Sequence, residues 1–238
     1  MNNFINKQLL FKKMEKLHRV QKLLSNYGYC SRRKAETLIQ DGRVKVNNKR
    51  ITIGDKATEK DSLYVDNKLV DKESKIYIIF NKPVGCVTAL RDIDYKTVMD
   101  FVKVKERVFP IGRLDFNTSG LLLLTNDGDF ANKVMHPRYE VEKTYIVEID
   151  RQISKKDILN IERGVKLRDG FTAPAKLRRI NLDIIEIKVH EGKNRVIRRM
   201  FNKLGYRVES LERVAIGNLQ LGKLKPKAFR ILKTEPMI

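Results

Sequence analysis

Residues 112–128 read GRLDFNTSGLLLLTNDG, and this stretch decides the fold of the larger part of the chain. A polar loop leads into the apolar run Leu121–Thr125, which predicts a buried strand, and residues 126–128 predict a tight turn. Asp115 lies in the loop just before the strand, and a rigid strand is a good platform for a catalytic side chain. A lone loop aspartate is, however, more often a surface residue that pairs with a neighbour such as Arg113.

Outward from this stretch, apolar patterning and turn residues predict further elements on both sides. A strand over 76–80 ends at Asn81-Lys82-Pro83, and a helix over 129–136 stops before Pro137. We expect strands over 143–150 and 183–190, extended chain from Arg207, a helix opened by Ser154, and a helix over 194–204. Strands outnumber helices and do not alternate with them, which indicates an α+β domain with a mixed, mainly antiparallel sheet.

The first part of the chain predicts a separate small module. A helix over 18–26 is followed by a second helix, with Ser31 as its N-cap and Gly42 as its stop. Residues 43–51 alternate apolar and basic side chains around Asn47-Asn48, which predicts a β-hairpin with a basic face. Two helices and a basic hairpin in so short a stretch are typical of a compact nucleic-acid-binding module.

Positive charge dominates the composition. The 238 residues include 50 Lys and Arg against 29 Asp and Glu, a net charge of +21. The stretch from Lys16 to Arg50 is especially basic, and Arg32, Arg33 and Lys34 fall in the first turn of the second helix. Cations there oppose the helix dipole at a cost of roughly a few tenths of a kcal/mol each, which an external phosphate would offset. The alternative is an ordinary solvated surface, but so large an excess favours a polyanionic partner.

The sequence lacks the motifs of several common metal-binding, cofactor-binding and hydrolytic sites. Two cysteines and three scattered histidines give neither a disulfide framework nor a zinc spacing. Phosphate-binding and dinucleotide-binding loops, zinc-protease and serine-hydrolase motifs are absent, so we expect no metal and no cofactor. No apolar run approaches the roughly 18 residues of a membrane span, and residues 1–13 are too polar for a signal peptide. We therefore expect a cytoplasmic protein without membrane contact.

Two further stretches carry candidate chemistry. The helix expected over 194–204 has an apolar face, which leaves Arg195, Arg198 and Asn202 together on the other side. Such a face could bind RNA phosphates, hold a buried carboxylate, or be solvated charge. Tyr145 alternates with apolar neighbours, so it could be a core residue or could stack on an extruded base.

The small module resembles the RNA-binding domain named after ribosomal protein S4. The resemblance rests on residues 19–24, Gly28, 31–35, Leu38-Ile39, Gly42 and 44–47. Asn48 stands where that family usually has glycine, and asparagine tolerates positive φ better than most residues. The resemblance implies binding to structured RNA through its shape and backbone.

The larger part resembles the pseudouridine synthases of the RsuA/RluB group, which carry an S4-type domain ahead of the catalytic domain. Residues 112–128 match the catalytic-aspartate motif, 135–137 with 142–145 match the tyrosine stretch, and 192–200 match the stretch with the active-site basic residue. Asn81-Lys82-Pro83 and residues 211–213 also match the sequence pattern of this group. Val196 departs from the family, which often has Gln or Glu there.

The resemblance implies an isomerase that converts a uridine of ribosomal RNA to pseudouridine, with Asp115, Tyr145 and Arg198 as catalytic residues. Arg198 would pair with Asp115 and keep it charged, and Tyr145 would stack on the base. We favour large-subunit RNA; a small-subunit site or a non-catalytic assembly protein are the alternatives. We expect an extension over 1–13, an S4-type domain over 14–72, a catalytic domain over 73–238, and a monomer that binds ribosomal RNA or a pre-ribosomal particle. The expected RNA-binding residues are Arg19, Lys22, Ser31, Arg32, Arg33, Lys34, Arg43, Lys45, Asn47, Lys49, Arg113, Arg195 and Arg199.

Overall fold

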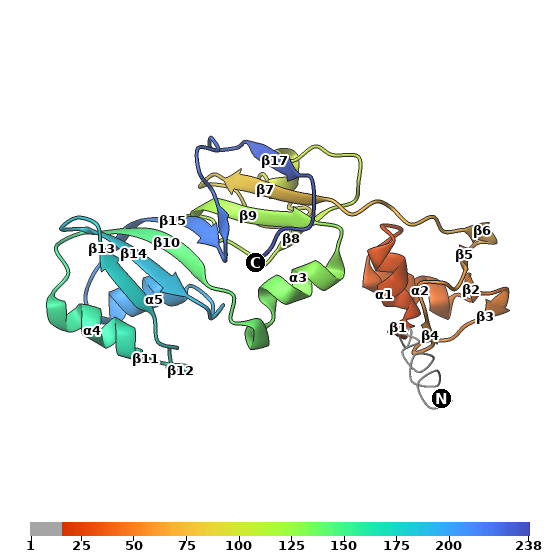
Figure 1. The fold of residues 1–238 in the computed structure, drawn as a ribbon, viewed down its shortest axis with the longest axis horizontal. Coiled ribbons are helices and arrows are strands. Elements are labelled where there is room, and N and C mark those ends of the chain that lie inside the picture. Colours follow the sequence, from red (N-terminus) through yellow and green to blue (C-terminus); the bar gives the residue numbers. More distant parts are fainter. Residues whose placement is uncertain (1–15) are drawn as a thin grey trace, which may run out of the picture. The chain divides into compact units, whose positions relative to one another are not determined.

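A computed structural model describes residues 16–238, which form two compact units that separate after Ser74 (Figure 1). The expected extension over 1–13 lies outside the described residues. Each unit has its own hydrophobic core. Among residues 16–238, no helix has the length and apolar character that a membrane span requires.

The first unit packs two helices on short strands. Helices α1 (Val20–Asn26) and α2 (Arg32–Gln40) contribute Leu23, Leu24 and Leu38 to its core. The strands are β1 (His18–Arg19) with β4 (Lys56–Ala57), and a sheet of order β3 (Lys49–Arg50), β2 (Val44–Val46), β5 (Leu63–Val65) and β6 (Lys68–Leu69).

Local sequence signals explain most of this unit. The Ser31 hydroxyl accepts a hydrogen bond from the Lys34 N–H at 3.2 Å, which confirms the predicted N-cap. Asn47 and Asn48 have φ of 47° and 67°, so both occupy the left-handed region that a tight hairpin turn requires. The first helix begins at Val20 rather than His18, because His18–Arg19 pair with Lys56–Ala57 instead.

The second unit is built on a nine-stranded sheet. Its main path runs β13 (Lys176–Arg179), β14 (Ile184–Val189), β10 (Lys143–Ile149), β15 (Val208–Ile216), β9 (Ser119–Thr125), β7 (Tyr77–Lys82) and β17 (Phe229–Leu232). Two short strands, β8 (Phe109–Ile111) and β16 (Leu219–Gln220), pair with β9 and β15. The pairing of β9 with β15 is parallel and the others are antiparallel, which confirms the expected mixed sheet.

Helices α4 (Lys155–Arg163) and α5 (Val196–Lys203) pack against the half of the sheet that contains β10 and β14. Helix α3 (Gly128–Met135) packs on the other half, where its Phe130 and Val134 join residues of β7 and β9. The remaining elements are the single turns η1 (Val98–Asp100) and η2 (Pro137–Tyr139) and the strand pair β11 (Lys166–Leu167) and β12 (Gly170–Phe171).

A glycine makes the parallel junction possible. Gly120, at φ 102°, lies opposite Arg213, and a Cβ at this position would approach the Arg213 carbonyl oxygen to 2.3 Å. Any larger residue would therefore push β9 and β15 apart. This matters for function because β9 directly follows the loop that carries Asp115.

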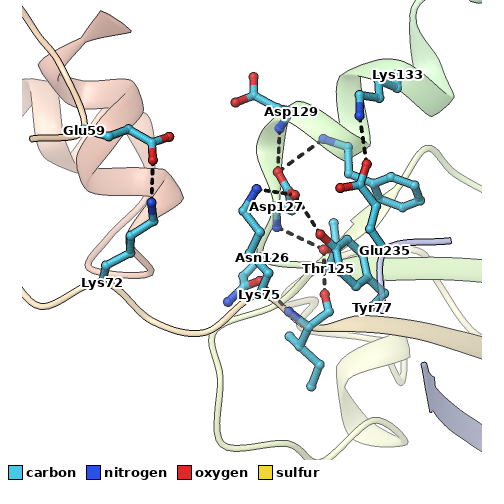
Figure 2. A network of polar contacts seen from close by, with 12 residues as sticks. Glu59, Lys72, Lys75, Tyr77, Thr125, Asn126, Asp127, Asp129, Lys133 and Glu235 are labelled. Carbon is cyan, nitrogen blue, oxygen red and sulfur yellow. Dashed lines mark hydrogen bonds and ion pairs between the residues drawn. The ribbon is translucent and has the colours of Figure 1, made fainter. Parts of the chain in front are cut away.

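A buried aspartate fixes the turn at the other end of β9. Asp127 accepts a hydrogen bond from Lys75 Nζ at 2.6 Å and from the Tyr77 hydroxyl at 2.9 Å (Figure 2). It also caps α3 by accepting from the Asp129 and Phe130 N–H groups. Burial opposes ionisation of this carboxyl, yet these hydrogen bonds hold its pKa below the ordinary value. The strand that supports the Asp115 loop is thus anchored at both ends.

Candidate active site

The loop between β8 and β9 is held by its backbone. The carbonyl oxygens of residues 114–118 all accept hydrogen bonds from other parts of the second unit. Lys82 makes two of these bonds: its Nζ donates to Asp115 O at 3.1 Å and to Thr118 O at 2.9 Å, and also to Pro83 O at 2.9 Å. The side chain is fully buried, and burial lowers its pKa although the charge of Asp115 raises it.

The segment after β7 supplies two more of these contacts. The Thr88 hydroxyl donates to Leu114 O at 2.8 Å, and it accepts from the Leu114 N–H at 3.2 Å. The Gly85 N–H donates to Phe116 O at 2.9 Å. The loop is therefore positioned by contacts that do not use the carboxylate of Asp115.

Arg198, on α5, makes the last contact and corrects one expectation. Its Nη2 donates to Asn117 O at 2.6 Å and its Nη1 to Val208 O at 3.1 Å. The expected ion pair with Asp115 is absent, because the guanidinium is engaged by these two carbonyls. Burial and the charge of Arg195 lower the pKa of Arg198, while the charge of Asp115 raises it. Arg198 thus lies within electrostatic range of Asp115 and orients its loop.

The Asp115 carboxylate itself has no hydrogen bond or ion pair with any residue in the described part of the chain. It lines a cleft of about 970 Å³ together with Tyr145 and Arg213. Residues 16–238 contain no cluster of three or more His, Cys, Asp or Glu side chains that could hold a metal ion. The cleft therefore contains the unpaired carboxylate of Asp115 on a rigidly held loop.

Tyr145 lies on β10 directly opposite Arg213 on β15. The Tyr145 hydroxyl accepts from Arg213 Nη1 at 3.3 Å, and the Arg213 guanidinium lies 5.9 Å from the centre of the ring. Arg213 is only 5% exposed, and its Nε donates to Leu121 O at 2.7 Å. The structure therefore brings Asp115 and Tyr145 into one cleft, with Arg198 behind the Asp115 loop.

The three arginines of this unit that we expect to bind RNA differ in exposure and in their partners. Arg113 and Arg195 are exposed and line the cleft. Arg199 forms a bidentate ion pair with Asp169, with distances of 2.8 and 3.1 Å. Arg195, Arg198 and Arg199 also line a second hollow with Lys166, Arg168 and Lys203, so basic side chains continue beyond the cleft.

In the first unit, several expected RNA-binding residues have structural partners. Arg43 pairs with Asp66 at 2.5 Å, and Lys45 donates to Asn67 Oδ1 at 2.9 Å. Asn47 donates to Asp61 at 2.6 Å, Ser31 caps α2, and Lys22 contacts His18. The other expected residues, Arg19, Arg32, Arg33, Lys34 and Lys49, are exposed.

Lys82 and Arg213 were missed as site residues by the sequence analysis. Asn81-Lys82-Pro83 and residues 211–213 belong to the family resemblance, but the resemblance assigns no site role to Lys82 or Arg213. In the structure, β7 continues through Lys82 with every residue buried. A lysine inside a run of buried strand residues was the available signal, because buried lysines need dedicated partners.

Both units of the chain match known protein families. Residues 76–203 match the RNA pseudouridylate synthase family, and residues 18–63 match the S4 domain. The chain is 45% identical to the ribosomal large subunit pseudouridine synthase B of Bacillus subtilis over 214 residues, which cover 86% of this chain and 88% of that protein. It is 37% identical to the dual-specificity RNA pseudouridine synthase RluF of Escherichia coli over 92% of this chain and 77% of that protein.

A solved structure extends the similarity to the fold. A crystal structure of a pseudouridylate synthase superimposes with a TM-score of 0.67 at 30% sequence identity, and it covers 90% of this chain and 96% of the other.

Proposed function

The chain belongs to the RNA pseudouridylate synthase family, and from this premise we propose that it isomerises a uridine of large-subunit ribosomal RNA to pseudouridine with Asp115 as its nucleophile. The observation that carries the assignment is the Asp115 carboxylate, which faces a cleft without a partner while its loop is pinned by five carbonyl contacts. The choice of the large subunit is supported by the name of the Bacillus subtilis relative.

The residues of the cleft suit this chemistry. The reaction breaks the bond from ribose to N1 of uracil, turns the base, and forms a bond through C5, so that C5 loses its proton and N1 gains one. An ionised aspartate can attack the nucleotide and leave again, and this needs no oxidant and no external energy. Because the loop is pre-positioned, little ordering is left for the reacting state. We assign Tyr145 to stacking on the base and to assisting removal of the C5 proton, with Arg213 holding its hydroxyl.

For the first unit we propose RNA binding through backbone contacts, and for the whole protein a cytoplasmic monomer. Ser31 places the first turn of α2 by capping it, and Arg32, Arg33 and Lys34 on that turn are exposed. The helix has no acidic residue there to offset them. A phosphate of the RNA would neutralise both these cations and the positive end of the helix dipole.

The proposed function is tested by mapping pseudouridine in ribosomal RNA from cells with and without the protein. We expect the loss of one or a few pseudouridines from large-subunit RNA, restored by the purified protein acting on RNA from the deficient cells. Loss from small-subunit RNA would move the target to the other subunit. An unchanged map in both subunits would contradict the enzyme and favour a non-catalytic assembly role.

RNA binding by the first unit predicts a specific salt dependence. Replacing Arg32 and Arg33 with Ala should weaken binding to ribosomal RNA and make the slope of log affinity against log salt shallower by roughly 1.5. Filter binding or fluorescence anisotropy over a series of salt concentrations measures this slope.

A matched control removes the same charge from the same helical position. Lys155 and Lys156 are exposed in the first turn of α4 and do not line the cleft. Replacing both with Ala should change the slope much less. Equal effects of the two double variants would mean that only total charge matters, and would contradict an RNA site on α2.

A further inference from the structure

Two of the buried or half-buried cations that line the cleft, Lys143 and Arg213, have no carboxylate partner among residues 16–238. Lys143 is the first residue of β10, two positions before Tyr145, so their side chains share one face of the sheet. Arg213 on β15 lies opposite Tyr145. Lys143, Tyr145 and Arg213 all line the cleft that contains Asp115.

Arg213 has an unused donor. Its Nε and Nη1 donate to Leu121 O and the Tyr145 hydroxyl, but its Nη2 is buried without a partner among the described residues. Leaving a buried donor unsatisfied costs about 1–3 kcal/mol, and more for a charged group. Arg213 lines the cleft although it is only 5% exposed, so a ligand in the cleft would be within reach of a cation whose hydrogen-bonding capacity is not fully used.

Lys143 is the second free cation. It is half-buried, and it forms no hydrogen bond or ion pair with another residue of 16–238. Burial, together with the charge of Arg213, lowers the pKa of Lys143 to about 8. The two like charges are thus held near each other in a partly dry site, which an anion would stabilise.

Among residues 16–238, no carboxylate forms an ion pair with Lys143 or Arg213. The other charged or titratable groups that line the cleft with Lys143 are Arg113, Asp115, Glu140, Tyr145, His190, Glu191, Lys193, Arg195 and Arg213. Glu191 accepts from the Ala173 N–H and pairs with Lys193, and neither Asp115 nor Glu140 forms an ion pair with Lys143 or Arg213. A bound anion would supply the negative charge that this pair lacks.

We propose that Lys143 and Arg213 form an anion site that binds a backbone phosphate of the nucleotide whose base stacks on Tyr145. The assignment rests on the proposed function. The backbone positions of Lys143 and Tyr145 are about 6.8 Å apart along the strand, so a base that stacks on Tyr145 would bring its own backbone close to Lys143. The site fixes the target nucleotide at its backbone while Asp115 faces the sugar and base.

The test measures binding without turnover, in the Asp115→Asn background, with large-subunit ribosomal RNA as the probe. Lysine binds a phosphate when protonated, so affinity should fall roughly fivefold between pH 7 and pH 9, as Lys143 loses its proton in the free protein. Lys143→Met should bind roughly tenfold more weakly at pH 7, lose this pH dependence, and make the salt slope shallower by about 0.9.

Lys143→Arg is the matched variant, since arginine keeps the charge and does not titrate in this range. We expect it to bind like the parent at pH 7 and to show no decline up to pH 9. Circular dichroism and thermal unfolding of each variant verify that the fold is retained.

Unchanged affinity and salt slope in Lys143→Met would overturn the phosphate site. Lys143→Met in the enzyme that keeps Asp115 could instead lower kcat and leave the affinity for RNA unchanged. That result would also overturn the phosphate site, and it would place Lys143 at the departing uracil. Failure of the proposed function is distinguishable, because it leaves the native enzyme inactive on ribosomal RNA while the binding effects of Lys143 persist.

Discussion

Replacing Asp115 with Asn should leave the protein folded and able to bind ribosomal RNA, yet reduce pseudouridine formation at least about a thousandfold. The amide has almost the same shape as the carboxylate but cannot attack as a nucleophile. Because the five carbonyl contacts of the loop use its backbone, the substitution does not touch what positions it. Tritium release from C5-labelled uridine in ribosomal RNA measures the rate.

The Asp115 carboxylate has no partner within residues 16–238, so its neutralisation should cost little stability, and the thermal unfolding midpoint should shift by no more than about 2 °C. Asp94→Asn is the control: it makes the same change of charge at an exposed position outside the cleft lining, and should keep full activity. Turnover retained by Asp115→Asn would exclude Asp115 as the nucleophile.

Features fixed by neighbouring residues could be predicted from the sequence. The Ser31 and Ser154 caps, the turn at Asn47-Asn48 and the strand at Leu121–Thr125 all depend on residues within a few positions of each other. Each has one physical cause, such as a free N–H at a helix start or the need for positive φ in a turn. These elements appear close to where the patterns predict them.

Contacts between distant residues could not be predicted in the same way. The pairing of β17 with β7 joins the end of the chain to the start of its second unit, and nothing in residues 229–232 alone marks this partner. The donation from Arg198 to Asn117 O spans 81 positions. The family resemblance implied that Arg198 pairs with Asp115, but in this structure its acceptors are the carbonyl oxygens of Asn117 and Val208. Helical spacing alone shows which face a side chain shares and not which atom it contacts.

Lys82 shows why a site residue can escape sequence reasoning. A lysine side chain is usually exposed to solvent, so the sequence pattern alone predicts that the buried strand ends at Lys82. The structure instead buries it completely and gives it three carbonyl acceptors, two of which lie more than thirty positions away. Burial of that charge is tolerated because every donor has a partner.

Lys82→Met should reduce kcat roughly a hundredfold and leave the affinity for ribosomal RNA nearly unchanged. Methionine fills a similar volume, but it removes the donor shared by the carbonyls of Pro83, Asp115 and Thr118. A displacement of about 1 Å in a reacting group can cost about a hundredfold in rate, whereas RNA phosphates are bound elsewhere. Single-turnover kinetics with saturating enzyme separates this rate from binding.

The stability of Lys82→Met shows whether the variant loses rate because the Asp115 loop is displaced or because the protein unfolds. Loss of three hydrogen bonds to a charged donor destabilises the fold, while removal of a buried charge stabilises it, so the two terms oppose each other. We therefore expect an unfolding midpoint close to that of the native protein, together with the loss of rate. Lys105→Met, at an exposed position of the same unit, should change neither quantity. A native rate in Lys82→Met would mean that Thr88, Gly85 and Arg198 suffice to hold the Asp115 loop.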